Sequence, residues 1–275
     1  SLMGAEILSL LPFALIISLS GFISGYMAGL LGVGGGIVIV PVLYYFLSLI
    51  GVPQDIVMHI SVATSLAVII PTGWRSYQSH KKNNGVDAGI LKTWLLPTML
   101  GSIIGANIAG MISGFWLTFI FASIALLVSV NLFISKENFK LGDSIPTGIL
   151  GNTIPLSVGA LSSMLGIGGG TFNVSIMTLY GRSIHTAVGT AAGLGFYLAI
   201  PGTLFFIITG WSVDNLPPGS IGYVNLIGLI LIAPISTIAA PIGARSAHSL
   251  NKRVLTNIFA IFLLFTSIRM FLEIF

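Results

Sequence analysis

The chain has 275 residues, of which 55% are hydrophobic and only 7% are charged. A typical soluble domain is roughly 25% charged, so the 11 basic and 7 acidic side chains cannot cover a water-facing surface, and the lipid bilayer must surround most of the chain. The absence of cysteine excludes a disulfide framework and a thiolate metal site, and the net charge of +4 indicates membrane topology rather than a nucleic-acid partner.

Ten apolar segments follow one another, separated by short polar or glycine-rich breaks. In the first half they span residues 9–31, 37–50, 56–71, 90–111 and 115–134. After a polar linker, residues 136–144, they span residues 145–165, 172–180, 185–209, 221–240 and 254–274. Most reach the ~20 residues that a membrane-spanning helix needs, but the segment after each glycine run is shorter. We therefore predict an all-α, polytopic transmembrane helix bundle with broken or re-entrant helices at the glycine runs. The number of crossings lies between eight, with two hairpins, and ten.

Internal similarity divides the chain into two repeats. The sequence LLGVGGG of residues 30–36 recurs as MLGIGGG at residues 164–170, and HISVAT of residues 59–64 recurs as HTAVGT at residues 185–190. Because order and spacing are nearly kept, we predict a duplication. Repeat 1 covers residues 1–135, the cytoplasmic linker residues 136–144, and repeat 2 residues 145–275.

The basic residues predict that the repeats have opposite orientations. If each repeat crosses the bilayer an odd number of times and the first terminus lies outside, ten of the eleven basic residues lie on the cytoplasmic side. These residues are Arg75, Lys81, Lys82, Lys92, Lys136, Lys140, Arg182, Arg245, Lys252 and Arg253. Cytoplasmic loops collect Lys and Arg, so the pattern favours inverted repeats in the inner, cytoplasmic membrane of the cell.

The duplicated glycine runs predict the substrate site. A helix that stops at a glycine leaves the first N–H groups of the next helix without intrahelical partners, and these groups favour an anion. Paired interruptions of this kind in inverted repeats indicate a site near the membrane midplane. The alternative is that the glycines only allow close helix packing. The candidate binding residues are the two glycine runs and nearby polar side chains: Gly34, Gly35, Gly36, Gly168, Gly169, Gly170, Thr171, Asn173, Thr64, Ser65 and Thr190.

Two histidines occupy matching positions in the repeats. His59 and His185 each precede a threonine by five residues. A histidine inside a membrane is a candidate for proton coupling or gating, because it titrates near neutral pH; near a segment end it can equally cap a helix. No carboxylate lies deep in a span, no catalytic set is present, and we expect no metal, no cofactor and no enzymatic activity.

These motifs resemble the TauE/SafE sulfite-exporter family. The resemblance rests on GLLGVGGG at residues 29–36, the second glycine run, HTAVGT at residues 185–190 and NGVD at residues 84–87. It covers essentially the whole chain and implies a transporter of small sulfur-containing anions such as sulfite, sulfoacetate or related sulfonates. Thr171 and Asn173 depart from the apolar residues that the family pattern implies there.

The sequence thus favours an alternating-access transporter, with an exporter as the direction that the resemblance implies. The anion would sit between the two glycine runs. An anion channel that uses the same amides, or a membrane scaffold that uses the glycines for packing, remain the alternatives. The partners that we expect are a small anionic substrate and the lipid bilayer, with a homodimer left open.

Overall fold

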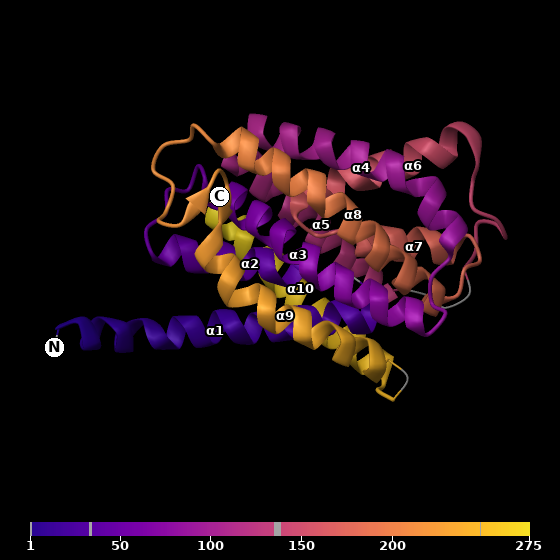
Figure 1. Ribbon diagram of the computed structural model, residues 1–275, viewed down its shortest axis with the longest axis horizontal. Coiled ribbons are helices and arrows are strands. Elements are labelled where there is room, and N and C mark those ends of the chain that lie inside the picture. Colours follow the sequence, from indigo (N-terminus) through magenta and orange to yellow (C-terminus); the bar gives the residue numbers. More distant parts are fainter. Residues whose placement is uncertain (1, 33–34, 135–138, 248) are drawn as a thin grey trace.

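The computed structural model describes residues 2–32, 35–134, 139–247 and 249–275, and these residues are mostly helical (Figure 1). The helices of the first half are α1 (Leu2–Leu31), α2 (Gly36–Leu49), α3 (Val57–Lys82), α4 (Ala88–Met111) and α5 (Gly114–Ile134). Those of the second half are α6 (Gly148–Leu165), α7 (Gly170–Leu179), α8 (Ile184–Gly210), α9 (Leu226–Ser246) and α10 (Lys252–Ile274). A small antiparallel hairpin, β1 (Ser220–Ile221) and β2 (Val224–Asn225), precedes α9. The predicted all-α class is confirmed.

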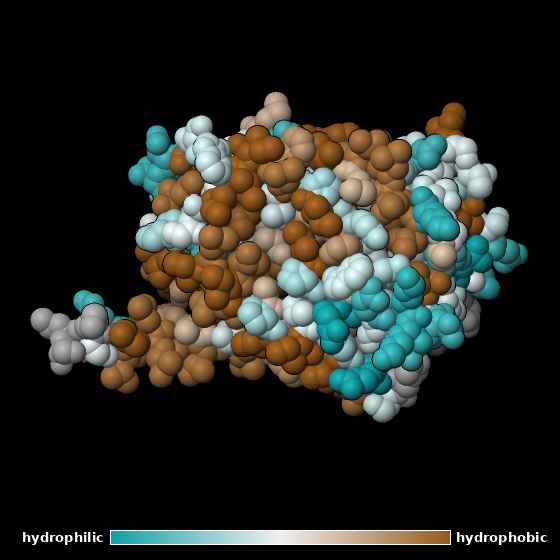
Figure 2. Space-filling model, viewed as in Figure 1, coloured by the Kyte–Doolittle hydropathy of each residue, from teal (hydrophilic) through white to brown (hydrophobic). Residues whose placement is uncertain are grey.

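Eight of the described helices are long and apolar enough to cross a membrane. The other two, α2 with 14 residues and α7 with 10 residues, are shorter than the ~17 residues that a span requires. Large apolar side chains such as Leu8, Ile149 and Leu272 are exposed by 69–85%, and Figure 2 shows such side chains covering the flank of the bundle. The chain is therefore a multi-pass membrane protein whose two short helices are the ones that follow the glycine runs.

The helices pair in a pattern that is nearly unchanged when the two halves are exchanged. Helix α1 packs on α9 as α4 packs on α6, and α2 packs on α3 as α7 packs on α8. Helices α3 and α8 pack on each other, as do α5 and α10. We propose that a pseudo-two-fold relation between the repeats produces this pattern. The inverted orientation of the repeats remains a prediction.

Close packing between the halves depends on small residues. Gly25 of α1 lies against the backbone of Ser236 in α9, and Gly159 of α6 lies against the backbone of Thr98 in α4. A methyl group at either glycine would overlap a carbonyl oxygen. These contacts are typical of membrane helices that approach closely at glycine, so packing explains these two glycines.

Two helix boundaries differ from the predicted segments. Helix α3 continues for eleven residues beyond Pro71, because proline is tolerated in a membrane helix and the polar residues that follow still support helical geometry. Helix α9 begins at Leu226, because residues 220–225 form the hairpin and the Asn225 side chain caps the helix by accepting a hydrogen bond from the Gly228 N–H (3.0 Å). The first difference matters for function, since it places Arg75, Lys81 and Lys82 on a helix.

Candidate anion-binding site: an inner cavity and a basic vestibule

The chain turns sharply between α6 and α7. Gly168 and Gly169 have φ angles of +69° and +80°, a left-handed conformation that side chains rarely adopt. The matching turn between α1 and α2 includes residues 33–34, so the predicted contact residue Gly34 lies outside the described part of the chain. Gly35, which precedes α2, has an ordinary right-handed conformation. The two turns are therefore similar in sequence but not identical in backbone geometry.

Both turns border one small cavity, which we call the inner cavity. Its volume is about 40 Å³, and it is lined by Ala28, Gly32, Gly35, Ile69, Thr72, Gly73, Ser76, Gly168, Gly170, Ala191, Ala192 and Gly195. Helix α2 begins directly after Gly35, and α7 begins at Gly170. The starts of the two short helices thus lie at the wall of the same cavity, although they come from opposite halves of the chain. Each start brings amides without intrahelical partners and about half a positive charge.

Helix α3 contributes two hydroxyl groups to the inner cavity. Thr72 Oγ1 donates a hydrogen bond to Ser236 Oγ (3.0 Å). The Ser76 side chain is 2% exposed, and its Oγ has no hydrogen-bond partner among the described residues. A buried hydroxyl without a partner is costly, so Ser76 is available to bind a ligand in this cavity.

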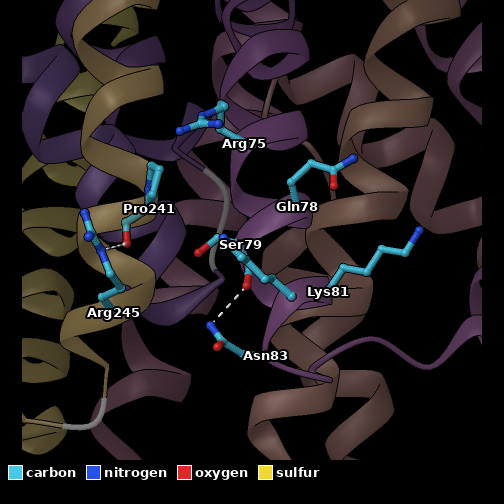
Figure 3. Close-up of a pocket in the computed structure, with 8 residues that line it drawn as sticks. Arg75, Gln78, Ser79, Lys81, Asn83, Pro241 and Arg245 are labelled. Carbon is cyan, nitrogen blue, oxygen red and sulfur yellow. Dashed lines mark hydrogen bonds between the residues drawn. The ribbon is translucent and has the colours of Figure 1, made fainter.

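A second, larger cavity lies on the same helix, nearer its end. We call it the basic vestibule; its volume is about 940 Å³, and it is lined by Arg75, Gln78, Ser79, Lys81, Lys82, Asn83, Pro241 and Arg245. Figure 3 shows that these residues come from the end of α3 and from α9. Among the described lining residues, four are cationic and none is acidic. The vestibule therefore provides a local positive field that attracts anions.

The vestibule and the inner cavity both lie along α3. Thr72, Ser76 and Ser79 are spaced by four and three residues, which places them on one face of the helix. The first two line the inner cavity and the third lines the vestibule. One helix face thus joins the two cavities, which have no lining residue in common within the described ranges.

Three of the predicted binding hydroxyls make structural hydrogen bonds and do not line the inner cavity. Thr64 Oγ1 accepts from the N–H of Asn225, the residue that caps α9 (3.0 Å). Thr190 Oγ1 accepts in the same way from the N–H of Asp87, which caps α4 (2.9 Å). Ser65 Oγ donates to the carbonyl oxygen of Gly166 (2.8 Å). These hydroxyls secure the starts of α4 and α9 and the turn before α7.

Of the other predicted residues, Gly35, Gly168 and Gly170 line the inner cavity, whereas Gly36, Gly169, Thr171 and Asn173 lie beside it in the chain. Gly36 packs against Gly166, where a methyl group would overlap the carbonyl oxygen. Asn173 is fully buried, and within the described ranges both polar atoms of its amide lack a hydrogen-bond partner, as does Ser162 Oγ. Both side chains approach Gly169, each 3.1 Å from the position that a Cβ atom would occupy on this glycine. This pair forms a second group of unsatisfied polar atoms next to the α6–α7 turn.

The two predicted histidines lie at opposite ends of the antiparallel helices α3 and α8. His59 Nε2 lies 3.0 Å from the carbonyl oxygen of Ile112, and its ring stacks on Tyr223. His185 Nε2 lies 3.3 Å from the carbonyl oxygen of Asn83, and its ring makes an edge-on contact with that of His80, with centroids 6.0 Å apart. Neither predicted histidine lines the inner cavity, and their proton-coupling role remains a prediction.

Thr72 and Ser76 line the inner cavity but are not among the predicted site residues, and Arg245 joins the basic residues of α3 only in the structure. The sequence signal for these positions is the spacing of the hydroxyl residues 72, 76 and 79, which places them on one face of a helix. This spacing has meaning only if one helix continues past Pro71, as α3 does, whereas the apolar pattern predicts that the third segment ends there.

Comparisons with known proteins agree with this architecture. The family described as "Sulfite exporter TauE/SafE" matches residues 17–270. A "probable membrane transporter protein" of Haemophilus influenzae is 32% identical over 95% of this chain and 99% of its own length. The "probable membrane transporter protein YunE" of Bacillus subtilis is 25% identical over 96% of this chain and 98% of its own length. No solved structure matches significantly. The chain therefore belongs to the sulfite exporter TauE/SafE family.

Proposed function

We propose that this protein is a secondary transporter that carries a small sulfur-containing anion, such as sulfite or a sulfonate, across the cell membrane. The descriptions of the family and of the relatives support transport rather than catalysis. The observation that carries the proposal is the inner cavity. Two helix starts from different halves meet there with the Ser76 hydroxyl, which has no hydrogen-bond partner among the described residues. This combination of amides, helix dipoles and a hydroxyl is suited to an oxyanion.

The size of the inner cavity supports a compact ligand. A volume of about 40 Å³ holds about three water-sized spheres. A cavity of this volume suits a sulfite ion or the head group of a sulfonate better than a larger organic anion.

The separation of the cavities favours a carrier over a channel. An anion would collect in the basic vestibule and then reach the inner cavity by movement of one half against the other. Alternating access of this kind is expected for repeats that hold a site between them. We propose that the basic vestibule faces the cytoplasm, in line with the positive-inside rule.

Exchange across proteoliposomes tests this function. We expect external sulfite to accelerate the efflux of labelled sulfite from loaded vesicles, because a carrier returns faster when it is occupied on both sides. Labelled sulfite that leaves without any such acceleration would favour a channel. A lack of flux with sulfite, sulfoacetate, methanesulfonate and thiosulfate would contradict transport of sulfur anions.

A further inference from the structure

We propose that the inner cavity selects singly charged anions over doubly charged anions of the same shape. This inference rests on the proposed function, since it specifies which charge state of an oxyanion the same cavity binds. For sulfite it means that the hydrogensulfite form is the bound species, and for organic substrates it favours a sulfonate with no second charged group inside the cavity.

The first observation is the chemistry of the cavity wall. The twelve described lining residues are glycine, alanine, isoleucine, threonine and serine, so none is ionisable. The region around the cavity is also poor in charge, because the buried residues in the described ranges include no Asp, Glu, Lys or Arg. An anion in the inner cavity therefore has no full positive charge beside it.

The second observation is that the cavity wall offers helix starts and a hydroxyl group in place of a cation. The starts of α2 and α7 each provide about half a positive charge, so together they balance about one negative charge. The Ser76 hydroxyl adds a donor that is buried and has no partner among the described residues. This hydroxyl is an observation independent of the helix starts, and it indicates that the cavity is built to hold a ligand.

The cost of removing an ion from water rises with the square of its charge, whereas its attraction to fixed dipoles rises only in proportion to the charge. A second negative charge thus increases the penalty fourfold but only doubles the attraction. In a cavity without a cation, the singly charged form is the one that the dipoles can stabilise.

The charged groups on neighbouring elements do not alter this conclusion. Arg75 is adjacent to Ser76 in the chain, but its side chain is exposed and lines the vestibule. Arg245 of α9 lines the vestibule as well. His80 of α3 is buried, with its Nε2 3.3 Å from the carbonyl oxygen of Gly29. Because a protonated imidazole would add a positive charge to this region, the main comparison below is made at a pH where an ordinary imidazole is uncharged. The vestibule would attract a doubly charged anion more strongly, so the discrimination must arise in the inner cavity.

Calorimetric titration of the purified protein with two anions of the same shape tests the proposal. At about pH 8.5, where an ordinary imidazole is neutral, methanesulfonate carries one charge and methylphosphonate is mostly doubly charged. At constant ionic strength, we expect methanesulfonate to bind at least about tenfold more tightly. A second pair of titrations at about pH 6 should bring the affinity of methylphosphonate toward that of methanesulfonate at the same pH, since the phosphonate then carries one charge. Methanesulfonate carries one charge at both pH values, so a change in its own affinity measures any effect of imidazole protonation.

The outcomes separate the two proposals. Methylphosphonate that binds at about pH 8.5 as tightly as methanesulfonate would overturn the charge selection and leave the anion site in place. Failure of both anions and of sulfite to bind at any pH would instead contradict the proposed function itself.

Discussion

The inner cavity and the basic vestibule lie along the same helix, α3, but they differ in size and in charge. The vestibule is about 940 Å³ with four cationic lining residues, whereas the inner cavity is about 40 Å³ with none. A large cationic space raises the local concentration of anions without discriminating finely among them. A small space lined by amides and a hydroxyl discriminates by shape and charge. We therefore propose that capture and selection are separate steps, and we expect substitutions in one region to leave the other step intact.

Filling the inner cavity should have the largest effect. We expect Ala191→Val to abolish anion binding, because the added methyl groups occupy the space that the ligand needs, at a stability cost of about 1–3 kcal/mol. Calorimetric titration with sulfite measures the loss. The matched control is Ala187→Val, one helical turn earlier on α8 and equally buried but away from the cavity. Retained binding in the Ala191 variant would show that the anion lies elsewhere.

Removing the free hydroxyl should weaken binding without destabilising the fold. A hydrogen bond to a charged group contributes about 1.5–3 kcal/mol, so we expect Ser76→Ala to reduce sulfite affinity about 10- to 100-fold. Its thermal stability without ligand should not fall, since Ser76 Oγ has no partner in the described part of the chain. Ser61→Ala, on the same helix, loses a bond to the Val57 carbonyl oxygen and should bind normally. Equal affinities for wild type and Ser76→Ala would remove this hydroxyl from the site.

Neutralising the vestibule should slow transport by a smaller factor. We expect Arg75→Gln combined with Arg245→Gln to lower the initial uptake rate about tenfold at low ionic strength. The difference should shrink at about 1 M salt, where the screening length is about 3 Å. The affinity of the inner cavity, measured by titration, should change little. Arg253→Gln is the control, because Arg253 contacts the Phe133 carbonyl oxygen and not the vestibule. A rate loss that high salt does not reduce would argue against electrostatic capture.

Hydroxyls outside both cavities should affect stability and leave affinity nearly unchanged. Thr64→Val and Thr190→Val each remove the acceptor for the N–H group of a helix-capping residue, Asn225 or Asp87. An unsatisfied buried N–H costs about 1–3 kcal/mol, which thermal unfolding in detergent would detect. Strongly reduced sulfite affinity in either variant would instead support the role in anion binding that the sequence suggested for these threonines.

The sequence predicted the helical class and the two glycine turns, because composition and segment length follow directly from the bilayer. It also identified Gly35, Gly168 and Gly170, which line the inner cavity. It could not identify Ser76, since only the packing of α3 against α1 and α8 shows that this hydroxyl faces a cavity. Thr64 and Thr190 illustrate the opposite problem. Each accepts a hydrogen bond from the N–H group of a helix-capping residue, but repetition in the sequence cannot distinguish a hydroxyl that binds a ligand from one that supports a helix start.

The most direct test is the position of a bound anion in the protein. Selenite is the selenium analogue of sulfite, and its anomalous scattering identifies the ion in a crystal of the wild-type protein. We expect the selenium peak in the inner cavity, next to Ser76 and between Gly35 and Gly170. A peak confined to the basic vestibule, with the inner cavity empty at saturating selenite, would contradict the proposal that the two glycine turns form the binding site.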